Sequence, residues 1–295
     1  MNLSLSRSFS IAKAALAAAA VACTFALACS LAGCASGGAD SSSADADNTS
    51  TSTDGKTLRV AMELAYPPFE TKDDAGNPEG LAVDFIRDFG AAYGYDVQIE
   101  NTAWDGLIPS LQSDKADLVI SSMTITDERK QSVDFSDAYA MAQLAILANA
   151  DSGVASIDDL NQPGKKVAVK TGSTGDVYAT KNLTNAEIVR LADESACVTE
   201  VVQGKADGFL YDQLTIYRNH QANPDTTEAV FIPFQDAEEW GIAVKKGNTE
   251  LLDQLNAFIA QSKTDGEFDR LTEKYLSEEK KAFDQYGFKW FFDFE

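Results

Sequence analysis

The residues best suited to bind a charged ligand lie in one short stretch of the chain. An apolar run ends in the hydroxyl residues Ser121, Ser122 and Thr124. Arg129 follows at the start of a predicted helix, three residues after Thr126, which has the side chain of an N-cap. That position normally favours Glu or Gln. A ligand anion explains an arginine there, because a guanidinium binds a carboxylate through two parallel hydrogen bonds.

Further candidate side chains follow other predicted strands at their carboxyl ends. They are Glu63, Tyr66 and Trp104 early in the folded part, and Lys170, Thr174 and Asp212 later. Open α/β sheets bind ligands beyond the carboxyl ends of their strands, so these side chains are expected to share a site with Arg129. Cationic and hydroxyl groups at one end, with the lone acid Asp212 at the other, match the carboxylate and ammonium of a free α-amino acid.

The elements that must position these residues alternate along the chain. The periodicity predicts strands at 57–62, 97–100 and 118–121 with helices at 79–93 and 105–114, and then a second series of strands at 164–169, 187–190 and 207–211 with helices at 176–182 and 194–203. One further strand is predicted at 240–244, followed by helices at 251–263 and 267–275. This order predicts an α/β fold with mainly parallel sheets flanked by helices. The aromatic tail 283–295 is expected to lie on the first lobe.

The first 33 residues have the composition of a secretory signal peptide. Arg7 and Lys13 precede an uncharged run rich in Ala, Val, Phe and Leu. A membrane-spanning helix is the alternative interpretation, since the run is long enough to span, but alanine is only weakly apolar. We predict that residues 1–33 are removed.

The residues that follow the signal predict a tethered protein. The sequence Leu31-Ala32-Gly33-Cys34 is similar to a bacterial lipobox, which implies a lipid on Cys34 and attachment to the extracytoplasmic side of the cell membrane. Residues 34–55 are rich in Ser, Thr, Asp and Asn and lack large apolar side chains, so they are predicted to form a flexible tether.

Charge and composition exclude several classes of function. Two of the 24 basic residues lie in the signal, so the mature chain keeps 22 basic and 46 acidic residues, a net charge of −24. Such a chain repels nucleic acid phosphates. His220 is the only histidine, so neither a Ser-His-Asp triad nor a metal site is expected, and no cofactor is implied. Cys197 is the only thiol left for the mature chain and is interpreted as a buried apolar residue.

Several motifs together give the chain a specific resemblance. They are Tyr66-Pro67-Pro68-Phe69-Glu70, Gly80-Leu81-Ala82-Val83-Asp84, Trp104 to Leu111, Met123 to Arg129, Phe135-Ser136-Asp137-Ala138-Tyr139 and Val167 to Gly172. The chain resembles the family 3 bacterial extracellular solute-binding proteins, the polar amino-acid receptors of ABC importers, of the glutamine, histidine or arginine type. The resemblance covers roughly 58–275 and implies a two-lobed, type II periplasmic-binding-protein fold that closes around one amino acid.

The resemblance also implies a role for each candidate residue and a boundary for each lobe. Arg129, Thr124 and Thr174 would hold the ligand carboxylate, while Asp212, helped by Ser121 or Ser122, would hold the ammonium. Tyr66 and Trp104 would sandwich the ligand side chain, with Glu63 and Lys170 at the far end of the pocket. The first lobe is predicted at 56–143 plus 237–295, and the second at 144–236.

Several alternatives stay open. Glutamine is the favoured ligand, because its amide can accept a hydrogen bond from Lys170 and donate one to Glu63, and a cationic amino acid such as arginine is second. The alternative for Glu63 and Lys170 is that they pair only with each other. A cyclohexadienyl-dehydratase-like enzyme and a ligand-sensing subunit for a membrane receptor are the other functions considered. We expect a monomeric receptor and not an enzyme. Its expected partners are a free amino acid, an ABC permease and the ATPase of that permease.

Overall fold

The computed structural model describes residues 56–286 and 289–294. The predicted signal peptide at 1–33, the tether at 34–55 and the lipidation of Cys34 all lie outside these residues and stay predictions. Within the two described ranges, none of the helices is both long and apolar enough to cross a lipid bilayer.

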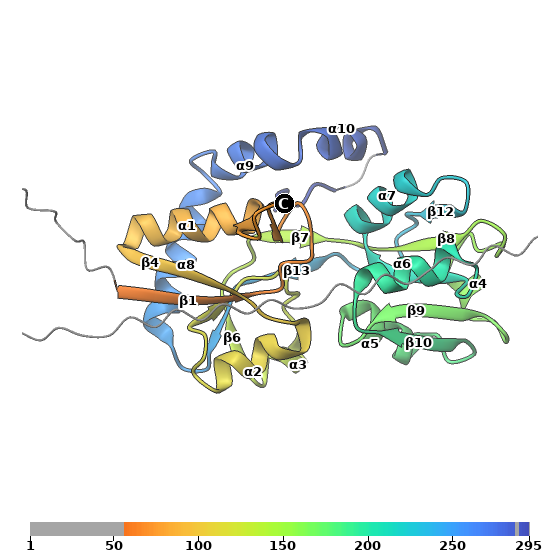
Figure 1. The fold of residues 1–295 in the computed structure, drawn as a ribbon, viewed down its shortest axis with the longest axis horizontal. Coiled ribbons are helices and arrows are strands. Elements are labelled where there is room, and N and C mark those ends of the chain that lie inside the picture. Colours follow the sequence, from red (N-terminus) through yellow and green to blue (C-terminus); the bar gives the residue numbers. More distant parts are fainter. Residues whose placement is uncertain (1–55, 287–288, 295) are drawn as a thin grey trace, which may run out of the picture. The chain divides into compact units, whose positions relative to one another are not determined.

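The first sheet has five strands in the order β4-β1-β5-β14-β6 (Figure 1). These strands span Tyr95–Asn101, Lys56–Met62, Leu118–Val119, Ala243–Lys245 and Val133–Phe135. β1 pairs in parallel with β4 and β5, whereas β14 runs antiparallel to both of its neighbours. Four of the five strands therefore share one direction, and the reversed strand comes from the far end of the chain.

The second sheet repeats this plan in the order β10-β9-β11-β8-β12. Its strands span Glu187–Leu191, Lys166–Lys170, Gly208–Asp212, Leu144–Asn149 and Thr227–Val230. Here β8 is the reversed strand, because it is antiparallel to β11 and β12, while β9 is parallel to β10 and β11. We call the parts of the chain built on the two sheets the first and second lobes. The exact lobe boundaries drawn from the sequence stay predictions.

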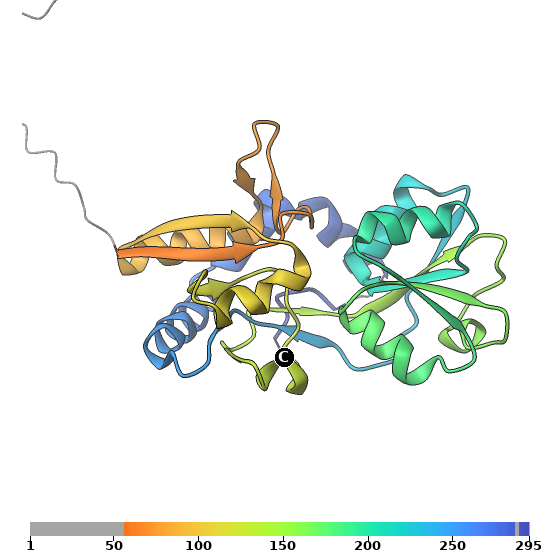
Figure 2. The same cartoon turned by 60° about the horizontal axis from the view of Figure 1, so that its bottom comes forward.

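Helices cover both faces of each sheet (Figures 1 and 2). In the first lobe they are α1 Leu81–Tyr93, the 3-10 turn η1 Trp104–Gly106, α2 Leu107–Gln112, α3 Asp127–Lys130, α8 Thr249–Ser262, α9 Glu267–Tyr275 and α10 Ser277–Tyr286. In the second lobe they are α4 Ile157–Leu160, α5 Thr174–Asn182, α6 Glu194–Val202 and α7 Gln213–Ala222. A small hairpin of β2 Thr71–Lys72 and β3 Pro78–Glu79 projects from the first lobe.

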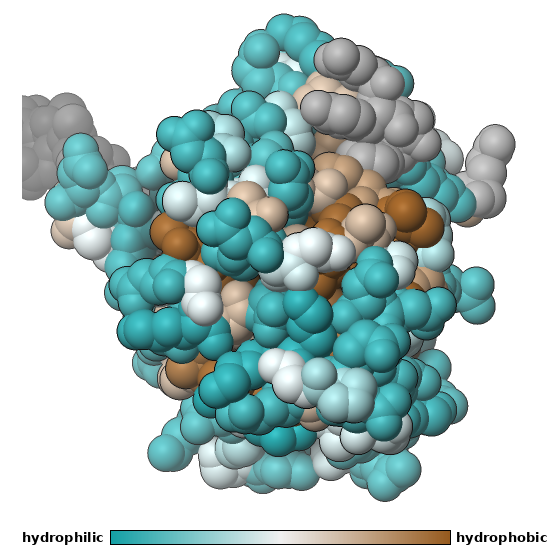
Figure 3. All heavy atoms as spheres, turned by 90° about the vertical axis from the view of Figure 1, so that its right-hand side faces the viewer, coloured by the Kyte–Doolittle hydropathy of each residue, from teal (hydrophilic) through white to brown (hydrophobic). Residues whose placement is uncertain are grey.

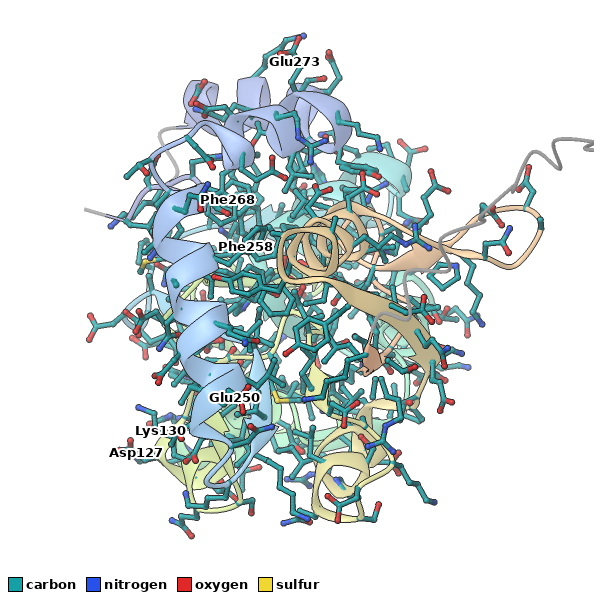
Figure 4. The ribbon with its side chains drawn as sticks, turned by 90° about the vertical axis from the view of Figure 1, so that its left-hand side faces the viewer. Asp127, Lys130, Glu250, Phe258, Phe268 and Glu273 are labelled. Atoms are coloured by element: carbon teal, nitrogen blue, oxygen red, sulfur yellow. The ribbon has the colours of Figure 1, made fainter. Side chains whose placement is uncertain are left out.

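The strand residues alternate between two cores in each lobe, as a sheet with helices on both faces requires. In the first lobe, Val60 and Leu118 face the aromatic core under α1, α8 and α9, while Ala61 and Val119 face the smaller core under α2. Figure 4 shows Phe258 of α8 and Phe268 of α9 turned toward the interior, and the ring centroids of both lie within 5.3 Å of that of Phe85. The second lobe has two smaller cores, and its outer face is mostly hydrophilic (Figure 3).

The prediction of a single strand at 240–244 is wrong, because the chain changes from one partner strand to another within this range. β13 Glu238–Trp240 pairs with β7 Ala140–Ala142, and β14 then joins the first sheet. Gly241 lies at the change, where an added Cβ would come within 2.8 Å of the Ile125 side chain. The β7 and β13 pair forms the ribbon beside which the chain crosses between the lobes.

The aromatic tail packs in the first lobe, as expected. Phe291 is fully buried, its ring lies 5.1 Å from that of Phe69, and its carbonyl accepts a hydrogen bond of 2.7 Å from the Met141 amide. Helix α10, which the sequence did not predict, leads into this tail.

Candidate functional site

One pocket gathers nine of the ten predicted site residues. Lys170 is the exception, but its ammonium is ion-paired to Glu63, which does line the pocket. The residues come from both lobes and lie at or beyond the carboxyl ends of β1, β4, β5, β9 and β11. The space left between the side chains is about 40 Å³. A cavity of that size holds only about three waters.

Arg129 stands in the pocket on the short helix α3. Its backbone amide donates to Thr126 Oγ1 at 3.2 Å, so the predicted N-cap forms. Its guanidinium donates to the carbonyl of Thr124 at 2.7 Å and, across the lobes, to the carbonyl of Gly172 at 3.1 Å. Gly172 has φ +74°, which suits glycine in that turn. Burial lowers the pKa of Arg129, and no carboxylate of the described residues forms an ion pair with it.

Glu238 is a site residue that the sequence interpretation missed. Its Oε2 accepts hydrogen bonds of 2.8 Å from both Thr124 Oγ1 and Thr174 Oγ1, one from each lobe. Its Oε1 accepts a third, of 2.7 Å, from Gln235 Nε2. The two threonines predicted to hold a ligand carboxylate therefore hold a carboxylate of the protein. The position of Glu238 in a crossing strand, next to a second glutamate, gave no periodic signal.

Lys170 and Glu63 lie together at the edge of the pocket. They form a cross-lobe ion pair in which the side chains are only 5% and 13% exposed. The Lys170 Nζ also lies 5.2 Å from the centroid of the Trp104 ring, and the Arg129 Cζ lies at the same distance from it. Trp104 is half-buried and so offers its face to two cations of the protein itself.

Asp212 ends β11 and caps helix α7. Its Oδ1 accepts from the amides of Leu214 and Thr215 at 2.9 and 3.1 Å, and its Oδ2 accepts from Thr215 Oγ1 at 2.8 Å. Burial raises the pKa of Asp212, although these bonds oppose the shift. Asp212 thus both caps helix α7 and lines the pocket.

The two serines after β5 have separate tasks. Ser121 Oγ accepts from the Glu63 amide at 3.0 Å and so links β5 to the end of β1. Ser122 has φ +48°, a left-handed conformation that is uncommon outside glycine and often found at functional sites. It directs its hydroxyl to Glu70 Oε2 at 3.1 Å. Glu70 lines the pocket, is 1% exposed and was not predicted, although it ends one of the motifs quoted above.

Tyr66 is packed more deeply than a simple ligand-stacking role requires. Its ring stacks on Phe69 at 5.5 Å and meets Trp240 and Tyr211 edge-on at 5.9 and 6.4 Å. Its hydroxyl is buried and, among the described residues, has no hydrogen-bond partner. Burial and the nearby Asp212 carboxylate raise the pKa of Tyr66. A polar ligand atom would satisfy this hydroxyl.

The pocket is more acidic than expected, because the sequence predicted only two acids in it, Glu63 and Asp212. Glu63, Glu70, Asp212 and Glu238 all line it, against Arg129 and the adjacent Lys170. Burial raises the pKa of Glu70 well above its usual range, and Glu63 adds to this shift. Glu194, which acts on Asp212 from α6, has its pKa raised to about 8 by burial and by Asp212.

In the described part of the chain, no group of three or more His, Cys, Asp or Glu side chains is arranged to hold a metal ion. His220 lies in α7 and is half-buried rather than solvent-exposed, with its Nδ1 3.3 Å from Thr227 Oγ1. Cys197 is fully buried in a second-lobe core, as interpreted from the sequence.

Comparison with known proteins agrees with this geometry. Residues 58–278 match the family model of the bacterial extracellular solute-binding proteins, family 3. A probable histidine-binding protein of Neisseria gonorrhoeae is 36% identical over 228 residues, which are 76% of this chain and 85% of the relative.

Two solved structures extend the comparison. An ancestral arginine-binding protein bound to arginine has a TM-score of 0.69 and 36% identity, over 75% of this chain and 98% of its own. The ancestral amino acid-binding protein AncCDT-1, a precursor of cyclohexadienyl dehydratase, has a TM-score of 0.68 and 38% identity, over 74% and 94%. These likenesses confirm the two-lobed type II fold predicted from the sequence.

Proposed function

We propose, from the premise that this chain belongs to the bacterial extracellular solute-binding proteins of family 3, that it receives one free amino acid between its lobes and delivers it to an ABC permease. The observation that carries the proposal is the Arg129 guanidinium. It faces the pocket, it is held by carbonyls from both lobes, and it has no ion pair among the described residues. A ligand carboxylate supplies the missing negative charge.

The opposite side of the pocket suits the ligand's ammonium. Asp212 and Glu70 are both buried there, and burial raises the pKa of each because an ionised carboxylate is costly away from water. A bound cation lowers that cost. A ligand that carries both charges contacts Arg129 in the first lobe and Asp212 in the second only when the lobes are together, so binding favours closure.

The acidic excess of the pocket changes the order of the ligand classes. Lys170 is already neutralised by Glu63, which leaves three acids, Glu70, Asp212 and Glu238, against Arg129. A cationic amino acid such as arginine or lysine therefore fits better than neutral glutamine, and glutamine becomes the second choice.

A screen of the twenty amino acids by thermal unfolding tests the proposal, because a tight ligand stabilises the folded state by mass action. Calorimetry on the best compound then gives its dissociation constant. We expect L-arginine or L-lysine to raise the unfolding temperature most, and L-glutamine less. A screen in which no amino acid shifts the transition contradicts the proposal.

The transport role includes attachment to the cell surface through Cys34. Mass spectrometry of the protein from membranes checks this step, since the mature N-terminus should be a lipidated Cys34. In a Cys34→Ala variant, the protein should leave the membrane fraction. Growth on the identified amino acid as sole nitrogen source should then fall, because the receptor is no longer held near its permease.

A dehydratase is the second candidate, favoured by the likeness to AncCDT-1 and by the buried acids of the pocket. Burial favours the protonated form of Glu70, an acid that lines the pocket, and a protonated acid is able to donate a proton. Against catalysis, the Asp212 carboxylate is already held by two backbone amides and a hydroxyl as the cap of α7. Incubation with prephenate and arogenate decides the matter, since measurable product would establish the enzyme.

A further inference from the structure

The carboxylate of Glu238 occupies the place expected for the carboxylate of a ligand. Thr124 follows β5 in the first lobe and Thr174 begins α5 in the second, and both hydroxyls donate to Glu238 Oε2 at 2.8 Å. These are the hydroxyls that the sequence assigns to ligand binding. Glu238 also acts electrostatically on Arg129, whose positive charge it supports. All three groups of the predicted carboxylate subsite are thus engaged by one internal acid.

We propose that Glu238 is an internal competitor for this subsite and sets both affinity and selectivity. The inference rests on the proposed function, because it concerns the same pocket. A ligand carboxylate gains the two threonine hydroxyls only when Glu238 gives them up. Every amino acid therefore binds less tightly than the subsite alone allows, and a cation without a carboxylate escapes this cost.

Hydrogen bonding and charge both argue that the two carboxylates cannot share the subsite. Each threonine hydroxyl has a single proton to donate, and both already donate to Glu238 Oε2, so a ligand carboxylate cannot receive these bonds while Glu238 stays in place. Two carboxylates on the same donors also repel each other, with Arg129 as the only cation between them among the residues that line the pocket. Glu238 is the first residue of β13 and follows a stretch without regular structure, 231–237, so its side chain can turn away without breaking a central strand.

The test compares an amino acid with its decarboxylated analogue in the full chain. Calorimetry is run with L-arginine and agmatine on the wild type, Glu238→Gln and Glu238→Ala. If glutamine is the tighter ligand in the amino-acid screen, L-glutamine and 4-aminobutanamide replace them. In Glu238→Gln the new side-chain amide still accepts hydrogen bonds from the threonines but carries no charge. Glu238→Gln therefore removes only the charge of the competitor, and Glu238→Ala removes its hydrogen bonds as well.

We expect the amino acid to bind more tightly in the order wild type, Glu238→Gln, Glu238→Ala, with a gain of about tenfold or more in the last, as one lost charge-assisted hydrogen bond implies. The amine should instead lose affinity, because Glu238 is the counter-charge that remains when no ligand carboxylate is present. This opposite response separates competition from a general loosening of the cleft.

Glu239→Gln is the matched control, since it removes the same charge from the exposed neighbouring side chain and should change neither affinity. Far-UV circular dichroism confirms that each variant is folded. The inference is overturned if the wild type binds the amino acid and Glu238→Ala binds it equally or more weakly, or if both ligands gain alike. If neither the wild type nor the variants bind any amino acid, the proposed function fails as well.

Discussion

Two cations, Arg129 in the pocket and Lys170 beside it, have similar surroundings, but only Lys170 forms an ion pair among the described residues. Each lies at or beyond the carboxyl end of a central strand, and each places its charge 5.2 Å from the centre of the Trp104 ring. Lys170 is neutralised by Glu63 of the other lobe, whereas Arg129 is held by two backbone carbonyls and has no ion pair among the described residues. Carbonyls orient a guanidinium without cancelling its charge, so Arg129 keeps its demand for an anion.

This difference between Arg129 and Lys170 indicates that the two ends of the binding site have different functions. The Lys170–Glu63 pair joins the lobes without any ligand atom, while the Arg129 end is completed only by a carboxylate, either that of Glu238 or that of a ligand. The free cation thus supplies ligand affinity, and the paired one influences which side chain is accepted beside it. Four variants test this division.

Loss of the free cation should have the largest effect. We expect Arg129→Ala to weaken amino-acid binding about a hundredfold or more, because truncating one partner of a desolvated charge pair costs roughly 2–5 kcal/mol. Calorimetry measures the change, and Arg87→Ala, on an exposed face of α1, serves as the control arginine. Unchanged affinity in Arg129→Ala would overturn the assignment of the carboxylate subsite.

Removal of the Asp212 charge should have the second largest effect on ligand affinity. Asn is as good a helix cap as Asp, so Asp212→Asn keeps the start of α7 while removing the negative charge. We expect about a thirtyfold loss of affinity, in line with roughly 2 kcal/mol for a charge-assisted bond, and little change in the unfolding temperature. Asp212→Ala should lose both affinity and stability. If Asp212→Asn binds like the wild type, Asp212 is only a cap.

Removal of Lys170, the cation that is paired with Glu63, should change ligand selectivity more than ligand affinity. In Lys170→Gln, Glu63 is left as a nearly buried acid without its partner, so a cationic ligand side chain can take the place of Lys170. We expect the affinity for L-arginine relative to L-glutamine to rise about tenfold. The double variant Glu63→Gln/Lys170→Gln should remove this gain. Equal changes for both ligands would show that the pair is purely structural.

Glu194 should have the smallest effect on ligand affinity, and its effect should be seen instead as a pH dependence of stability. Its pKa is raised to about 8 from the usual 4.5, so in the folded protein it keeps a proton that the unfolded chain has lost. Stability should therefore fall as pH rises from about 4.5 to 8 and level off above. Glu194→Gln should lack this fall, so its free energy of unfolding relative to that of the wild type should be higher at pH 8 than at pH 4.5. Denaturant unfolding across this range checks the sign.

Sequence periodicity predicted the regular elements best where a single face is buried. Leu81, Phe85, Ile86 and Phe89 recur at helical spacing, and all four are fully buried on α1. The bounds of helix α7 were not predicted, because its sequence is mostly polar and its start depends on the Asp212 cap. The division between β13 and β14 was missed because it depends on pairing with β7 and β5, which lie roughly a hundred residues away in the sequence.

The same limit applies to the site. Motifs placed Arg129, Asp212 and their neighbours at strand ends, and the fold brings those ends together. Periodicity carries no information on Glu238, because its position comes from the crossing ribbon and its partners come from both lobes. The internal competition therefore became visible only in three dimensions.

The reversed strand in each sheet has a consequence for how much of the chain must be present before each sheet is complete. All five strands of the second sheet lie in one unbroken piece of chain, 144–230. The first sheet instead waits for β14 at Ala243–Lys245, and its aromatic core waits further for α8, α9 and Phe291. The lobe that begins first along the chain is thus completed last, and one edge of β5 has no partner strand until β14 is in place.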